Sequence, residues 1–179
     1  MIEDLELLLV IAEITGIFVG FGALISLSRP KDVDDMQVLQ IRGVVSIGLM
    51  VFVVALLPVL LNRYGVEGHP LWFVCSLVFL VLNWGSLIQG FRESDSRALA
   101  ATHARVYPLR TMFFWLLLEV FMQAPLYLIL LGLYPDFEPA LYTTSLLFNL
   151  FEGVYVLAQV VYGDAPSSDS AHTPHVIHG

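Results

Sequence analysis

Apolar positions along the chain fall into five long runs that are separated by polar connections. The runs cover about residues 5–27, 43–61, 71–90, 111–133 and 139–162. Each is close to the roughly 20 apolar residues that a helix needs to cross a bilayer core of about 30 Å. The connections are rich in Pro, Gly, Asp and Arg, which is typical of turns and loops. The pattern predicts an all-α integral membrane bundle of five transmembrane helices.

The five runs form a single predicted transmembrane domain, residues 1–163. Residues 164–179 begin with Asp-Ala-Pro-Ser-Ser-Asp-Ser and are too polar to fold alone, so we expect a disordered tail. The first run is preceded by Glu3 and Asp4, whereas a secretory signal peptide begins with basic residues. We therefore interpret it as a retained span.

The basic residues predict the orientation of the bundle. Seven of the eight lie in the first and third connections, and loops rich in Lys and Arg stay in the cytoplasm. This places the N-terminus outside, the C-terminal tail in the cytoplasm, and the protein in the cell membrane (inner or plasma) as a multi-pass protein. The first connection contains Arg29, Lys31 and Arg42, the third contains Arg92, Arg97, Arg105 and Arg110, and the second contains Arg63.

Composition narrows the function classes. The chain is 58% hydrophobic and only 13% charged, which is unlike a soluble domain, and its net charge of −8 argues against a nucleic-acid partner. Cys75 is the single cysteine, so an internal disulfide and a cysteine-based zinc site are excluded. His69 and His103 fall on opposite sides of the predicted membrane and cannot share a metal. No catalytic or nucleotide-binding motif is present, so we expect no enzyme activity, cofactor or metal.

Three carboxyl side chains lie inside the predicted spans: Glu13 in the first, Glu119 in the fourth and Glu152 in the fifth. No Lys or Arg lies at a comparable depth. An ionisable group at the centre of a bilayer costs about 2.5–3.5 kcal/mol on insertion scales, so each is a candidate functional residue.

The fourth and fifth spans form a predicted hairpin around Asp136. Glu119 lies about 17 residues before this turn and Glu152 about 16 after it, so the two should be at nearly the same depth at about 1.5 Å per residue. Gln123 and Asn149 are level by the same count. We therefore expect a carboxyl pair and an amide pair stacked across the hairpin, a pattern suited to sharing a proton or a small cation.

A polar stripe follows the fifth span at alternating intervals of four and three residues, and only Val156 interrupts it. We expect this stripe to face a protein interior, a subunit interface or water. Asn83 in the third span is either a hydrogen-bonding contact between helices or the inner neighbour of the Glu119 and Glu152 pair. The stripe consists of Glu138, Tyr142, Ser145, Asn149, Glu152, Val156 and Gln159.

Small residues recur every four positions in the first span, at Ala12, Gly16 and Gly20. Such a ladder is typical of close helix packing in membranes. Glu13 borders the ladder, so we expect its carboxyl to point into a tight helix interface. The functional alternative makes Glu13 the outer acid of an ion pathway.

Two prolines lie inside predicted spans and remove backbone donors. Pro58 frees the carbonyl of Val54, and Pro125 frees the carbonyl of Phe121. Kinks of this kind are ordinary in membrane helices. The Phe121 carbonyl lies within a turn of Glu119 on the same span, which leaves a ligating or gating role open.

The leading hypothesis is a small proton- or cation-conducting channel or transporter that uses Glu13, Asn83, Glu119, Gln123, Asn149 and Glu152. The alternative is a non-catalytic accessory or assembly subunit of a membrane complex, in which the same side chains hydrogen-bond helices together. Besides the lipid bilayer, we expect self-association, with another membrane subunit as the partner under the alternative. The acidic entry into a Gly-rich first span resembles small prokaryotic membrane proteins, a likeness that implies no function.

Overall fold

The structure is a computed structural model that describes residues 2–28, 35–92 and 108–162. These residues are helical apart from short turns and contain no strand. Five helices are long and apolar enough to cross a membrane, which confirms the predicted all-α class and the five candidate spans. The predicted disordered tail, residues 164–179, lies outside the described residues. The elements are α1 (Ile2–Ser28), α2 (Asp35–Arg63), α3 (His69–Arg92), α5 (Pro108–Leu130), the 3₁₀ turn η1 (Pro135–Phe137) and α6 (Glu138–Tyr162).

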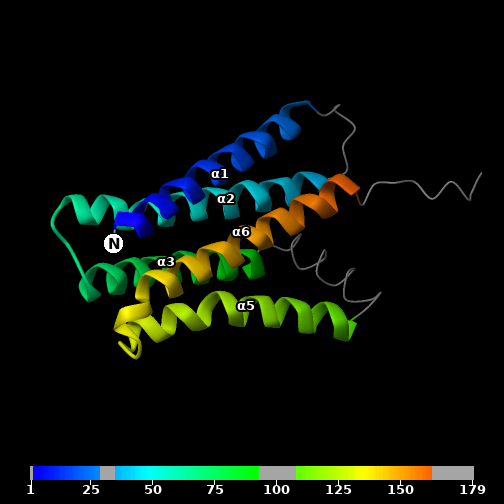
Figure 1. The fold of residues 1–179 in the computed structure, drawn as a ribbon. Coiled ribbons are helices and arrows are strands. Elements are labelled where there is room, and N and C mark those ends of the chain that lie inside the picture. Colours follow the sequence, from blue (N-terminus) through cyan, green and yellow to red (C-terminus); the bar gives the residue numbers. More distant parts are fainter. Residues whose placement is uncertain (1, 29–34, 93–107, 163–179) are drawn as a thin grey trace, which may run out of the picture.

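The helices run lengthwise beside one another, and α6 occupies the centre (Figure 1). Helix α6 contacts α1, α2, α3 and α5, whereas α1 lies at the edge and packs mainly on α2. The start of α1, the α2–α3 connection and the α5–α6 turn lie at one end of the bundle, which we call the N-terminal end. The central position of α6 agrees with the polar stripe in its sequence, because the polar positions of a membrane helix avoid lipid.

Glycines end two of the helices. Gly132 has a φ of 64°, which lets the Leu133 amide donate to the Leu128 carbonyl at 3.2 Å and closes the last turn of α5. The end of α2 repeats this arrangement at Gly65, with a φ of 81°. The fourth span was predicted to reach residue 133, but its helix ends at Leu130 because the glycine turns the chain.

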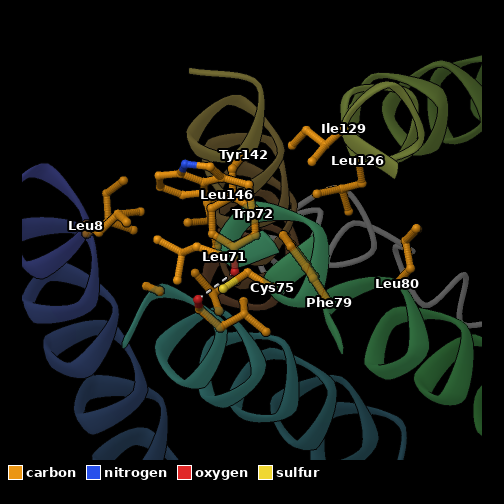
Figure 2. Close-up of a cluster of buried hydrophobic side chains, with 14 of the residues drawn as sticks. Leu8, Leu71, Trp72, Cys75, Phe79, Leu80, Leu126, Ile129, Tyr142 and Leu146 are labelled. Carbon is orange, nitrogen blue, oxygen red and sulfur yellow. Dashed lines mark hydrogen bonds between the residues drawn. The ribbon is translucent and has the colours of Figure 1, made fainter. Parts of the chain in front are cut away.

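The hydrophobic core draws side chains from all five helices and centres on Tyr142 of α6 (Figure 2). The Tyr142 ring packs against Trp72 and Phe79 of α3, with ring centroids 5.6 Å and 6.0 Å away. Trp72 and Tyr142 precede the predicted site residues on their helices, so this packing fills the half of the bundle nearer the N-terminal end. Further core residues include Leu8, Leu71, Cys75, Leu126, Ile129 and Leu146.

Close packing against α1 also uses glycines outside the predicted ladder. A Cβ on Gly48 of α2 would lie 2.5 Å from the Val19 Cγ2 atom of α1, and a Cβ on Gly153 of α6 would lie 3.4 Å from Phe18 Cε1. At Gly48 any larger residue would force the helices apart, whereas the contact at Gly153 is only tight.

The predicted ladder contributes unevenly to this packing. Ala12 is buried and Gly16 faces Phe52, but Gly20 is exposed, with nothing within 4 Å of a Cβ built on it. A four-residue step turns a helix by about 40° beyond one full turn, so the ladder rotates away from the buried side. Within this chain, the expectation that Gly20 packs against a neighbouring helix is therefore wrong.

Candidate functional site

Glu119 on α5 lies at the meeting point of three helices. Its Oε1 atom accepts a hydrogen bond from the Asn83 amide of α3 at 3.2 Å and another from the Gln123 amide one turn along α5. The Asn83 and Gln123 side chains are only 6% and 7% exposed. Three of the residues singled out in the sequence are therefore in direct contact inside the bundle.

Glu152 approaches the same place from α6. Its side chain is half-buried, and the charge of Glu119 acts on its carboxyl. We call Asn83, Glu119, Gln123 and Glu152 the carboxyl cluster. In the described part of the chain, neither carboxyl forms an ion pair with Lys or Arg.

The amide pair expected one turn away is not joined by a hydrogen bond between its members. Gln123 turns towards Glu119, whereas Asn149 donates to the Met122 sulfur at 2.9 Å. Asn149 Oδ1 is buried and has no hydrogen-bond partner among the described residues. The count from the turn predicts only the depth of a residue. Gln123 and Asn149 point in different directions from their helix axes and therefore have different partners.

The polar stripe of α6 faces the interior of its own bundle over its first three turns. Glu138, Tyr142, Ser145 and Asn149 are at most 1% exposed. Of the three surroundings that the sequence allowed for the stripe, these four residues therefore have the interior of the bundle, and not a subunit interface or water.

A partly buried contact at the N-terminal end was not predicted. Glu138, the first residue of α6, is hydrogen-bonded to Nδ1 of His69, the first residue of α3. The Glu138 carboxyl is buried, while the His69 side chain is 46% exposed.

A sequence signal for this contact exists in the spacing of polar residues on the two helices. His69, Ser76 and Asn83 recur every seven residues on α3, as Glu138, Ser145 and Glu152 do on α6. The first members of the two series meet in the contact just described. Of the last members, Asn83 is hydrogen-bonded to Glu119, and Glu152 is affected by the Glu119 charge. Two stripes of equal period on neighbouring helices can meet at every repeat.

Glu13 is not part of the carboxyl cluster. Its side chain is exposed on the outer side of α1, so the expectation that it points into a tight interface is wrong for this chain. Ala12 and Thr15 take the buried side, and Glu13 follows on the other side because each residue turns the helix by about 100°.

No protein-family model, curated protein or solved structure matches this chain. The described residues contain no group of three or more His, Cys, Asp or Glu side chains that could hold a metal ion.

The cluster combines two carboxyls with two amides that hold one of them in place. Two carboxyls on neighbouring helices can hold a proton or a small cation between them. Carboxylate and amide oxygens are also the ligands that hard cations prefer. Binding and release of a proton or a small cation is the chemistry that this arrangement suits best.

Proposed function

We propose that this protein is a small proton or cation transporter of the cell membrane, with its N-terminus outside and the carboxyl cluster as its binding site. The observation that carries the proposal is the position of Glu119, which is hydrogen-bonded to Asn83 and Gln123 between apolar helices. It has no basic partner among the described residues.

The cost of placing carboxyls at this depth supports a functional reading. Each costs about 2.5–3.5 kcal/mol on insertion scales, while a hydrogen bond between membrane helices returns about 0.6–2 kcal/mol. In the proposed mechanism Glu119 and Glu152 share the proton or cation, and Asn83 and Gln123 orient Glu119. The unpartnered Asn149 oxygen, one turn nearer the N-terminal end, is the next acceptor along α6.

The packed core bears on how transport would proceed. Trp72, Phe79 and Tyr142 fill the bundle between the carboxyl cluster and the N-terminal end. The proposal therefore takes this conformation as closed towards that end, and opening as a movement of α3 against α6.

Flux through purified protein in liposomes tests the proposal. Vesicles that contain a pH-sensitive dye should show leak with the wild type and strongly reduced leak with Glu119→Gln/Glu152→Gln, which keeps the volume and polarity of both side chains. Glu67→Gln, in the exposed α2–α3 connection, is the control and should match the wild type. Wild-type and doubly substituted protein that are equally tight to H⁺, Na⁺ and K⁺ would contradict transport.

A second candidate function is an accessory or assembly subunit. The exposed Glu13 carboxyl favours it, because a carboxyl that faces lipid calls for a partner outside the chain. Under this reading the carboxyl cluster only fastens α3, α5 and α6 together. Glu119→Gln/Glu152→Gln would then leave flux at background and lower the thermal stability of the purified protein.

A further inference from the structure

The outer side of α1 carries a regular seam of exposed residues. The side opposite to it holds Leu8, Ile11 and Thr15, which are buried against the bundle. Intervals along the seam alternate between four and three residues, which is the spacing of helices that pair as left-handed coiled coils. We call this the α1 seam, and it consists of Glu6, Val10, Glu13, Ile17, Gly20 and Leu24.

The apolar members of the seam are among the more exposed hydrophobic side chains of the helix. Val10, Ile17 and Leu24 are 49%, 57% and 59% exposed. Gly20 adds an open position, since nothing lies within 4 Å of a Cβ built there. A second helix can therefore approach the seam closely around Gly20.

Glu13 lies near the middle of the seam and of the membrane. The apolar stretch of α1 runs from Leu5 to Leu24, so Glu13 is about 12 Å from its nearer end at about 1.5 Å per residue. A glutamate side chain is too short to bring its carboxyl to the interface from there. Among the described residues Glu13 has no hydrogen-bond partner, and its neighbours Val10 and Ile17 are apolar.

We propose that the α1 seam pairs with the α1 seam of a second copy of this chain. Copies inserted in the same orientation place their α1 helices in parallel, so the two Glu13 carboxyls meet at the same depth on a two-fold axis. A protonated carboxyl both donates and accepts, so one copy of Glu13 satisfies the other without a basic residue. The second copy thus supplies a hydrogen bond that the described residues of one chain do not offer to Glu13.

This interface is separate from the carboxyl cluster. The hydrogen bonds of Glu119 go to Asn83 and Gln123 and involve no seam residue, so the dimer can form whether or not the protein transports ions. A measurement of association tests the dimer alone, so a monomeric protein would not contradict the proposed function.

Photobleaching of single fluorescently tagged full-length chains in lipid vesicles tests the dimer. The wild type should bleach in two steps, and Glu13→Leu mostly in one, with the association constant reduced about 3- to 30-fold. Glu13→Gln is the matched control, because its amide also donates and accepts, and it should keep two steps. One-step bleaching of the wild type, or an unchanged two-step pattern in Glu13→Leu, would overturn the proposal.

Disulfide cross-linking tests the seam in a chain that keeps Glu13. Ile17→Cys should form a covalent dimer in oxidised membranes, and Val81→Cys, on α3 and 63% exposed, should not. The native Cys75 is buried and serves as the background. Absence of the dimer at position 17, or equal cross-linking at both positions, would contradict pairing through α1.

Discussion

The hydroxyl of Tyr142 on α6 donates a hydrogen bond of 2.7 Å to the carbonyl oxygen of Val54 on α2. In a regular helix this carbonyl would accept from the amide of residue 58, but Pro58 has no N–H. Tyr142 is fully buried, so its hydroxyl supplies the donor that water cannot. The bond thus satisfies both groups and fastens the central helix to its neighbour.

Tyr142→Phe should show how much this hydrogen bond contributes to stability. It leaves the Val54 carbonyl buried without a partner, which costs about 1–3 kcal/mol in the free energy of unfolding. In a Pro58→Ala background the loss should be much smaller, because the backbone amide that alanine restores at this position then serves Val54. Thermal unfolding in detergent measures both, with Tyr155→Phe as a control on a half-buried tyrosine. An equal loss in the two backgrounds would contradict the assignment.

This bond also illustrates what sequence can and cannot predict. Pro58 identifies the free carbonyl from local rules alone. The donor is 88 residues away in the chain, and only the packing of α6 against α2 selects it. The choice of Tyr142 therefore depends on tertiary contacts that no local pattern encodes.

In the carboxyl cluster, too, the sequence predicts one property and not another. It predicts the depth of a residue along its helix, but not the direction in which the side chain points. Counting from the hairpin turn predicted that Glu119 and Glu152 share a depth, and in the structure the charge of Glu119 acts on Glu152. Direction around a helix axis depends on which neighbours a helix has. For that reason Gln123 and Asn149 have different partners, and Glu13 lies on the outside of α1.

The contact between His69 and Glu138 should stabilise the N-terminal end of the bundle. Because the Glu138 carboxyl is buried, His69→Leu removes the partner of a group that water cannot reach, and we expect a loss of about 1–3 kcal/mol in the free energy of unfolding. In His69→Leu/Glu138→Leu both polar groups are gone, so the loss should be smaller than the sum of the single changes. Chemical unfolding of the four proteins in detergent gives the coupling. A coupling of zero would show that the pair contributes nothing.

Close contact between α1 and α2 should depend on Gly48. A Cβ at this position would lie 2.5 Å from Val19 Cγ2, so Gly48→Ala forces the helices apart and should cost about 1–3 kcal/mol. Gly85→Ala is the matched control, because nothing lies within 4 Å of a Cβ there and alanine favours a helix. Melting temperatures in detergent should fall for the first variant and stay or rise for the second. Equal behaviour of the two would mean that α1 does not pack on Gly48.

The proposed orientation makes a prediction about which connections meet the outside of the cell. Basic residues concentrate in the first and third connections, which favours a cytoplasmic side for both, and hence an outside position for the α2–α3 connection. Glu67→Cys should therefore react with a membrane-impermeant maleimide on intact cells, whereas Ala100→Cys should react only after the membrane is opened. The wild type is the control, because its Cys75 is buried in the core and should stay unlabelled in both conditions. Labelling of Ala100→Cys in intact cells would show that the bundle has the opposite orientation. It would also place Glu138 and His69 on the cytoplasmic side, because they share the end of the bundle with residue 67.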